Sequence, residues 1–519
     1  MQFEPKVSAQ ESSTAMGFPL KQRLGLIVGP ALALAVLFLT DLDPSNPAVG
    51  RTAAVAVLMA VWWITEAIPI PATALLPIAL FPALGIMPGK TVAGLYFNNI
   101  IFLFIGGFIM ALAMQRWQLH KRIALNIIRI IGAGPRRLVL GFMVATAFLS
   151  MWISNTATTM MMLPIAMAVI IKLRESEDDI GRFPVGLLLG IAYAASVGGM
   201  ATLIGTPPNL SFSRIFAIYF PAAPEISFAQ WFGFGLPLSV VLLAIIWVVL
   251  TTIGADRSLR FRTDRHMFRR ELTQLGRPSI EEKAVLVLFV LMALMWLFRR
   301  DIVLGSLVIP GWSALMPSPD FIDDGTIAIG VALLLFVIPS RSRPGKRLMS
   351  WRAAAKLHWG IVILFGGGFA LAGGFKESGL SVWVAHQVSG LSDVPALGLV
   401  AGICTTLTFL TELTSNTATT EMVLPLLGSL AVAIKCNPLL LMIPATLSAS
   451  CAFMLPVATP PNAIIFGSGE VRMADMIRVG ILLNLIGVVL ITLFVYLLGP
   501  LVFEIDLGQM PAWATELGR

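Results

Sequence analysis

Serine, asparagine and threonine occur together twice in this otherwise apolar chain, in SNTATTMMMLPIA from Ser154 and in SNTATTEMVLPLL from Ser415. Nine of the thirteen positions are identical. Hydroxyl and amide oxygens can coordinate a hard monovalent cation, and the free N–H groups of a helix that begins at such a motif attract carboxylate or phosphate oxygens. Neither motif contains Lys, Arg or His. The residues therefore predict an anion site whose charge is offset by helix ends and bound cations, which favours sodium coupling.

Two further pairs of motifs show that the duplication is not local. FIGGF from Phe104 matches FGGGF from Phe365 at the same offset of 261 residues that separates the two SNT motifs. GTPPN from Gly205 matches ATPPN from Ala458 at an offset of 253 residues. Three matches in the same order indicate that the chain consists of two halves derived from one unit.

The proline pairs of the third motif interrupt two long apolar stretches, near residues 185–219 and 439–466. Proline cannot donate a backbone hydrogen bond, so each stretch is expected to be a broken helix. The prolines are Pro207 and Pro208 in the first half and Pro460 and Pro461 in the second. With the two SNT motifs, they give four broken elements that can converge on one anion.

Composition excludes several other kinds of protein. Only 12% of the 519 residues are charged, against roughly 25% in a soluble protein. The net charge of +8 comes in short bursts, which argues against a nucleic-acid-binding surface. Cysteines and histidines are scattered singly, with no metal-ligand spacing and no nucleophile beside a base, so we expect neither a metal site of that kind nor an enzyme. They are Cys404, Cys436, Cys451, His120, His266, His358 and His386.

Apolar stretches long enough to cross a bilayer occur along the whole chain, since about 20 residues suffice for a hydrocarbon core about 30 Å thick. Besides the two broken helices, spans are expected near residues 24–40, 52–65, 72–87, 100–115, 234–255, 284–298, 326–338, 361–375 and 479–503. The protein is thus predicted to be an all-α, multi-pass membrane protein with about eleven transmembrane helices.

Basic bursts give the orientation of these spans, because cytoplasmic loops are enriched in Lys and Arg. Such bursts occur in residues 116–137, 256–283 and 339–356. We expect all three to be cytoplasmic, with the N-terminus inside, the C-terminus outside, and the protein in the plasma membrane, or the inner membrane of a bacterium.

Residues 138–171 form a charge-free stretch with basic residues at both ends. Its 34 residues are too few for two crossings, so a re-entrant hairpin that turns near Ser154, Asn155 and Thr156 fits better. Counting spans places the matching hairpin, residues 394–434, on the opposite face. This is the inverted-topology repeat of secondary transporters, which bind substrate and ions near the midplane where discontinuous helices meet.

Two acids on the second hairpin, Glu412 and Glu421, have methionines at the equivalent positions of the first, Met151 and Met160. Ionisable groups at membrane depth are candidates for function. Glu412 could pair within the protein or tune a cation site, whereas Glu421 could face headgroups or water.

These motifs resemble the divalent anion/sodium symporter (DASS) family, the INDY-type carriers that include mammalian sodium-coupled citrate and dicarboxylate transporters. The resemblance extends over nearly the whole chain, through TEAIPIPATALLP, RWQLHKRIAL, SMWISNTATT, YAASVGGMATLIGTPPN, LTSNTATT and ATPPNAIIF. It implies a homodimer in which a scaffold domain holds the dimer together and a transport domain moves as an elevator.

On this basis the chain divides into a cytoplasmic segment (1–23), first-half scaffold helices (24–115) and first-half transport elements (116–233, with the hairpin 138–171 and the broken helix 185–219). Second-half scaffold helices (234–360) follow, then second-half transport elements (361–480, with the hairpin 394–434 and the broken helix 439–466) and a last helix with an external C-terminus (481–519).

The resemblance also implies site residues. The first sodium site falls on Ser150, Ser154, Asn155 and Gly205, and the second on Thr411, Thr414, Asn416 and Ala458. Substrate contacts fall on Asn155, Thr156, Thr206, Asn416, Thr417 and Thr459, with Pro460 packing nearby. The repeat supports the sodium sites independently, because its offsets pair Ser150 with Thr411, Asn155 with Asn416, and Gly205 with Ala458.

We therefore expect a symporter that couples two or more sodium ions to import of a C4-dicarboxylate (succinate, malate or fumarate) or of citrate, with Asn155 and Asn416 each serving both ion and anion. Exchangers of the family substitute a protein cation for sodium, and none occurs at the matching positions. Sodium-independent dicarboxylate exchange is the alternative, followed by sulfate transport; the sequence does not choose between citrate and succinate.

Overall fold

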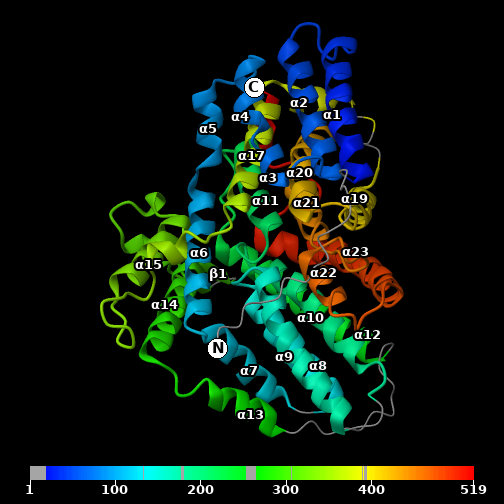
Figure 1. Cartoon of the computed structure of the whole chain (residues 1–519). Coiled ribbons are helices and arrows are strands. Elements are labelled where there is room, and N and C mark those ends of the chain that lie inside the picture. Colours follow the sequence, from blue (N-terminus) through cyan, green and yellow to red (C-terminus); the bar gives the residue numbers. More distant parts are fainter. Residues whose placement is uncertain are drawn as a thin grey trace.

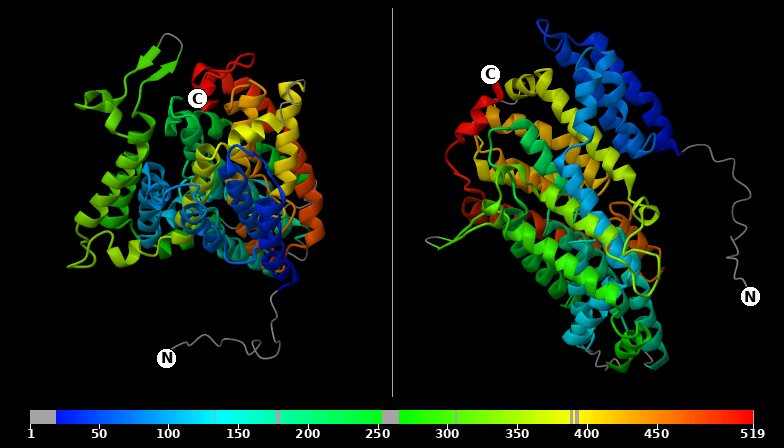
Figure 2. Two further views of the ribbon diagram at one scale, coloured as in Figure 1. Left: turned by 90° about the horizontal axis from the view of Figure 1, so that it is seen from above. Right: turned by 90° about the vertical axis from the view of Figure 1, so that its left-hand side faces the viewer.

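The computed structural model of the chain describes residues 19–132, 134–176, 180–252, 265–304, 307–387, 390 and 394–518. Helices make up nearly all of it (Figure 1). Within the described residues, the only named strands are the antiparallel pair β1 (Ile302–Leu304) and β2 (Leu307–Ile309). Both views in Figure 2 show this hairpin on the rim of the molecule. The predicted all-α class is confirmed.

The chain begins with two long helices packed side by side, α1 (Leu20–Leu39) and α2 (Pro47–Thr65). The Asn46 side chain accepts a hydrogen bond from Ala48 N at 3.2 Å, so it caps α2. The span expected at 72–87 is two short helices. The remaining helices of this part are α3 (Ile70–Thr73), α4 (Leu76–Ala83), α5 (Gly89–Tyr96), α6 (Asn99–Arg116) and α7 (Leu119–Ile131).

The predicted re-entrant hairpin corresponds to two helices, α8 (Pro135–Ser150) and α9 (Asn155–Ser176). The turn is slightly earlier than expected, over residues 151–154, so that Asn155 and Thr156 are already helical. The broken helix follows as α10 (Phe183–Met200) and α11 (Pro207–Tyr219). Its break covers residues 201–206, and the prolines begin α11, where a missing N–H costs no helical hydrogen bond.

The middle of the chain contains α12 (Phe228–Thr252), α13 (Arg265–Gln274), α14 (Ile280–Leu297), the 3-10 turns η1 (Trp312–Leu315) and η2 (Pro319–Phe321), α15 (Asp324–Val337) and α16 (Trp351–Ala354). Helix α15 packs along α6, and α12 packs along α10. These helices therefore join the two halves of the repeat.

The second half repeats the first. It contains α17 (Trp359–Glu377), α18 (Leu380–Gln387), the hairpin α19 (Ala396–Leu410) and α20 (Asn416–Ala433), and the broken helix α21 (Leu439–Ser448) and α22 (Pro460–Phe466). The chain ends with α23 (Met473–Phe503) and η4 (Ala512–Gly518). Again the proline pair begins the second half-helix.

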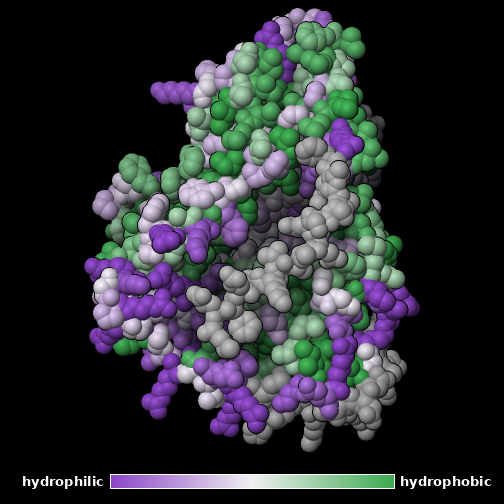
Figure 3. Space-filling view, viewed as in Figure 1, coloured by the Kyte–Doolittle hydropathy of each residue, from purple (hydrophilic) through white to green (hydrophobic). Residues whose placement is uncertain are grey.

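Eight helices of the described residues are long and apolar enough to cross a membrane. They differ in burial: 94% of the apolar window of α10 is buried, against 11% for α1. Hydrophobic residues cover much of the upper part of the molecule in Figure 3, where α1, α2 and α4 lie. Hydrophilic residues gather at its lower left.

The basic segments predicted to share one side of the membrane contact one another. Trp117 Nε1 donates to the carbonyl of Leu348 at 2.9 Å, which joins the first burst to the third. Arg122 forms an ion pair with Glu282, next to the second burst. Helices α7 and α13 lie together at the lower end of Figure 1. Residues 256–264 of the second burst lie outside the described residues.

Candidate functional site

The first SNT motif lies at the tip of the α8–α9 hairpin, where its polar atoms meet the first broken helix. Ser150 Oγ, at the end of α8, is 2.6 Å from Asn155 Oδ1 and 2.7 Å from the carbonyl oxygen of Ala195. One hydroxyl proton cannot fully serve two acceptors. The three atoms therefore form an oxygen-rich cluster.

The Asn155 carboxamide extends this cluster to the break in the α10–α11 helix. The end of the amide beside Ser150 also lies 3.2 Å from the carbonyl oxygen of Ala195 and 3.3 Å from that of Gly205. With its nitrogen there, the amide donates to both carbonyls. With its oxygen there, four oxygens converge with too few protons between them, which is the environment that a sodium ion fits. Ser154 lies on the turn, where its hydroxyl accepts from Ala157 N at 3.3 Å.

The second SNT motif repeats this geometry. Thr411 Oγ1 is 2.7 Å from Asn416 Oδ1 and 2.9 Å from the carbonyl oxygen of Ala449. Ala458 lies in the break between α21 and α22, one residue before the N-cap Thr459, as Gly205 lies one residue before the N-cap Thr206. The Thr414 hydroxyl is instead 2.9 Å from the Leu410 carbonyl and 2.6 Å from the Thr419 hydroxyl. These contacts leave Thr414 outside the hydrogen bonds of the second cluster.

Two asparagines to which the sequence analysis gave no role hold the broken helices open. Asn209 Nδ2 donates to the carbonyls of Thr202 and Gly199 at 2.7 and 3.2 Å. Asn462 Nδ2 donates to the equivalent carbonyls, of Leu455 at 3.1 Å and Ala452 at 3.0 Å. Both side chains are wholly buried. The signal was available, because this asparagine is the last residue of both TPPN motifs.

The predicted substrate residues lie at the starts of four helices. Asn155 and Thr156 begin α9, and Asn416 and Thr417 begin α20. Thr206 and Thr459 are the N-caps of α11 and α22, and Pro460 is the first residue of α22. Helix α9 packs against α22 and α11 packs against α20, so each pair combines the two halves. Each of the four helices has an N-terminus, which attracts negative charge.

The two N-cap threonines differ in their bonds. The Thr459 hydroxyl accepts from Asn462 N at 3.3 Å, whereas Thr206 makes no side-chain capping bond. Both side chains are buried. The Thr459 hydroxyl uses only an acceptor lone pair in this bond, so both threonine hydroxyls keep a proton that can be donated to an anion.

Glu412 pairs within the protein, which was one of the two alternatives left open by the sequence. Its carboxylate accepts from the backbone N–H groups of Phe453, Met454 and Leu455 at 2.7, 2.8 and 3.0 Å. Asn484 Nδ2 donates to it at 2.8 Å. Glu412 therefore satisfies the N–H groups that the break after α21 leaves without helical partners.

Glu421 does not face headgroups or water, and that expectation was wrong. Its side chain is wholly buried, and Ser211 Oγ of α11 donates to Oε1. The reason is tertiary: α11 and α17 pack against α20, and Glu421 lies on the side that they cover, next to Ser211 and Gly368.

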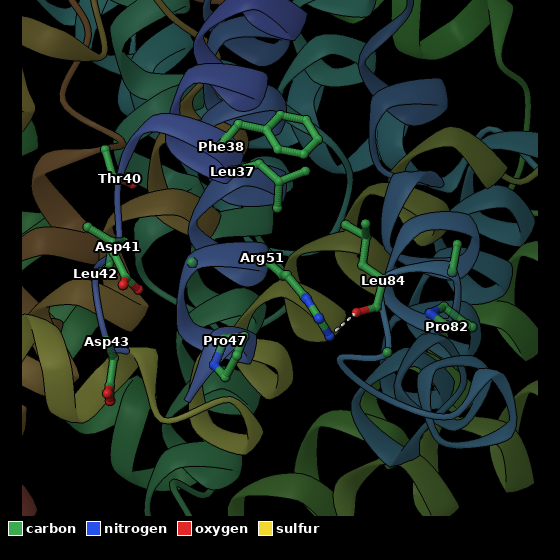
Figure 4. A pocket seen from close by; sticks show the side chains of 13 residues that line it. Leu37, Phe38, Thr40, Asp41, Leu42, Asp43, Pro47, Arg51, Pro82 and Leu84 are labelled. Atoms are coloured by element: carbon green, nitrogen blue, oxygen red, sulfur yellow. Dashed lines mark hydrogen bonds between the residues drawn. The ribbon is translucent and has the colours of Figure 1, made fainter. Parts of the chain in front are cut away.

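Two cavities of the structure differ in whether they reach these residues. One, of about 660 Å³, lies between the α1–α2 connection and the end of α4 (Figure 4). Arg51 points across it to the Leu84 carbonyl at 3.0 Å, and Asp41 and Asp43 lie on its other side. None of the predicted site residues lines it.

The other cavity, of about 430 Å³, reaches the tip of the first hairpin. It is lined by Gln115, Gln118 and His120 from the α6–α7 corner and by Ile153, Ala157, Thr158, Met160 and Met161 from the hairpin. Burial lowers the pKa of His120, whose Nδ1 is 3.0 Å from the Met114 carbonyl. Ala157 follows Thr156 directly in the chain, and Gln118 and His120 belong to the first basic segment, so the cavity lies between the hairpin tip and that segment.

Comparison with known proteins gives consistent matches. The family described as "Sodium:sulfate symporter transmembrane region" matches residues 21–505. The sodium-dependent dicarboxylate transporter SdcS of Staphylococcus saprophyticus is 43% identical over 496 residues, covering 94% of this chain and 93% of that protein. SdcS of Staphylococcus aureus is 44% identical over 501 residues, covering 95% and 94%. The crystal structure of the Alcanivorax borkumensis YdaH transporter has a similar fold, with a TM-score of 0.55 at 15% identity over 78% of this chain and 87% of that one.

Proposed function

This chain belongs to the family described as "Sodium:sulfate symporter transmembrane region", and from that premise we propose that it is a sodium-coupled symporter of C4-dicarboxylates. The observation that carries the proposal is the duplicated cluster of hydroxyl, amide and carbonyl oxygens at the two hairpin tips. Each cluster adjoins helix N-termini that can bind an anion. The names of the relatives, which are 43 and 44% identical, favour dicarboxylate over the sulfate of the family's description.

Asn155 and Asn416 couple the two ligands in this proposal. The side chain of each belongs to an oxygen cluster, while its backbone N–H is among the free donors at the start of a helix. A residue that contacts both ion and anion raises the affinity for each when the other is bound, because coupling free energy is reciprocal. Each helix N-terminus supplies about half a positive charge, and sodium supplies the remainder needed by a dianion.

The remaining site residues complete the two sodium sites and the anion site. Ser150, Ser154, Asn155 and Gly205 form the first sodium site, and Thr411, Thr414, Asn416 and Ala458 form the second. Thr156, Thr206, Thr417 and Thr459 contribute hydroxyls to the anion, with Pro460 packing beside it. Thr414 takes part only if its hydroxyl turns away from Thr419, which it contacts at 2.6 Å.

The protein acts as a homodimer in the plasma membrane, with a cytoplasmic N-terminus and an external C-terminus. The mutual contacts of the three basic segments support this orientation, since they gather positive charge on one face. Transport follows an elevator mechanism in which the elements of 116–233 and 361–480 move against those of 24–115 and 234–360, except that α17 stays with the scaffold, as its repeat equivalent α6 does.

Uptake of labelled substrates into proteoliposomes tests the proposal. We expect saturable succinate uptake driven by an inward sodium gradient and absent with potassium. Malate and fumarate should compete, and the effect of citrate will define how large an anion is accepted. Uptake that requires internal dicarboxylate and ignores sodium would show an exchanger, and strong inhibition by sulfate with no dicarboxylate transport would show a sulfate carrier.

A further inference from the structure

Equivalent glycines of the two halves pack against different elements. A Cβ on Gly107 of α6 would lie 3.3 Å from the side chain of Ile204, in the break between α10 and α11. Its equivalent in α17, Gly368, packs instead against α20, where an added side chain would overlap the carboxyl of Glu421. In one half the glycine therefore contacts the broken helix, and in the other it contacts the hairpin.

The exposure of the equivalent residues shows the same reversal. Ile204 is 8% exposed, whereas its equivalent Val457 is 71% exposed. Met160 is 61% exposed, whereas its equivalent Glu421 is wholly buried. The first half thus buries the residue of the broken helix and exposes that of the hairpin. The second half exposes the residue of the broken helix and buries that of the hairpin.

The neighbouring glycines show that the rest of the arrangement is symmetric. Gly106 packs against the backbone of Ala328 in the second half, and Gly367 packs against the backbone of Ala74 in the first. The helices that carry the glycines therefore stay in equivalent positions, while the hairpins and broken helices occupy two different positions relative to them.

Two positions of one repeating unit are what alternating access requires. The exposed Met160 lines the 430 Å³ cavity beside the basic face, so this structure is open on the side proposed to be cytoplasmic. If each half adopts the arrangement now seen in the other half, the cavity closes over Met160 and Val457 becomes buried. The same change opens the equivalent space on the external side, next to Glu421.

The surroundings of Glu421 suit a neutral acid in the present state. Oε1 accepts from Ser211 Oγ, and Oε2 has no hydrogen-bond partner in the described part of the chain. Burying an ionised carboxylate without a cation is strongly disfavoured. Charged or titratable residues on the helices packed against α20 include Arg51 (α2), Arg214 and Tyr219 (α11), Lys376 and Glu377 (α17) and His386 (α18). No ion pair described in the structure involves Glu421.

We propose that Glu421 is a proton-binding site that is occluded when the carrier is open inward and exposed to external water when it is open outward. The inference rests on the proposed transport function. On closing to the outside, the carboxylate takes a proton from external water, and the O–H bond breaks again when the outside reopens. The proton is thus taken from and returned to the same side, so external acid favours the inward-open state without proton transport.

Cysteine labelling tests this without any substrate. In a variant whose three native cysteines are replaced, Met160→Cys reports the inward-open state through its labelling rate by an impermeant thiol reagent from the cytoplasmic side at constant pH. Lowering only the external pH should raise this rate, by at most about tenfold per pH unit for one linked proton. Val457 is also exposed in this state, so the labelling rate of a Val457→Cys variant provides a second reporter of the inward-open state.

Glu421→Gln should make labelling fast at every external pH, because an amide is buried without a proton. Glu421→Met, which restores the residue of the first half, should do the same and guards against a folding defect of the first variant. Asp43→Asn, at an exposed acid of the α1–α2 loop on the same side, should leave the pH response intact.

A pH response that survives in both Glu421 variants, a rate that follows internal pH, or no response in the parent would overturn the proposal. Net proton movement, measured with an internal pH dye during sodium-driven succinate uptake, would overturn the same-side exchange. If labelling responds as expected but sodium drives no dicarboxylate uptake, the proposed function alone fails.

Discussion

The two halves of the repeat agree in the atoms that face the proposed ligands and differ in the atoms that face the protein. Ser150 and Thr411 make the same pair of contacts, to an asparagine amide and to a helix carbonyl. Asn209 and Asn462 bind equivalent carbonyls. This agreement is what the proposed function requires, because both clusters are proposed to bind the same ion.

The differences lie one layer further out. Glu412 satisfies three N–H groups of the second break, whereas in the first half the Thr202 hydroxyl donates to the carbonyl of Met151 at 2.6 Å. The first half has Gly199, in the last turn of α10, where the second half has Ala452. The halves therefore build equivalent sites with different supports, and variants can separate site from support.

The largest expected effect is on the site itself. Asn155→Ala and Asn416→Ala should each reduce sodium-driven succinate uptake about 10- to 100-fold, because each removes a side-chain ion ligand worth about 1–3 kcal/mol while the backbone N–H that faces the anion remains. Initial rates in proteoliposomes measure this. Asn126→Ala is the matched control, since that amide binds only the Arg122 carbonyl on α7. Full activity in only one of the two site variants would show that Asn155 and Asn416 are not functionally equivalent.

The next largest effect is expected from loss of the Glu412 carboxylate, which binds the backbone N–H groups of the second break. Glu412→Ala leaves three buried N–H groups and the Asn484 amide unpaired, so we expect the free energy of unfolding to fall by about 3–5 kcal/mol. Glu412→Gln keeps acceptor capacity and should cost clearly less. Thermal unfolding in detergent compares the two variants, and equal losses would show that charge matters more than the hydrogen bonds.

Adding a methyl group at Gly199 should have a larger effect than removing one at the equivalent residue, Ala452. A Cβ at Gly199 would lie 2.8 Å from Asn155 Oδ1 and 3.1 Å from the Gly205 carbonyl oxygen. Gly199→Ala should therefore cost about 1–3 kcal/mol of stability and most of the uptake. The reverse change in the other half, Ala452→Gly, should cost only about 0.5–1 kcal/mol. Similar losses of uptake in both variants would contradict the asymmetry.

The smallest effect is expected at a threonine hydroxyl that has a hydrogen-bond partner in the second half but none in the described part of the first half. Thr158 Oγ1 is buried without a partner in the described part of the chain, while its equivalent Thr419 contacts Thr414. Ile153→Thr places a hydroxyl at the position equivalent to Thr414. Gain of a hydrogen bond and loss of apolar burial nearly cancel, so we expect stability to change by less than about 1 kcal/mol. A stabilisation well above this would show that the hydroxyl is a defect of the first half.

Much of this arrangement could be predicted from the sequence. The basic residues at both ends of residues 138–171 located the first hairpin to within a few residues, because burying charge in lipid is costly. The duplicated SNT motif then located the second. The proline pairs located both breaks, although the prolines begin the second half-helices instead of ending the first. Candidate ligands followed from the duplication and the resemblance.

The burial of Glu421 could not be predicted, because it depends on which helices cover α20 in this conformation. Periodicity identifies the faces of a helix but not the neighbour of each face. The bonds of Thr414 were missed for a related reason: a hydroxyl near a site has several local acceptors, and only the backbone path decides between them.

The burial of α10 also predicts how the protein responds to bilayer thickness. A helix with 94% of its apolar window covered by protein meets almost no acyl chain, whereas α1, at 11%, is surrounded by lipid or another subunit. Mismatch between a helix and the bilayer is absorbed by tilting of lipid-exposed helices. Lipids with longer or shorter chains should therefore tilt α1 and leave α10, with the asparagine-braced break at its end, almost undisturbed.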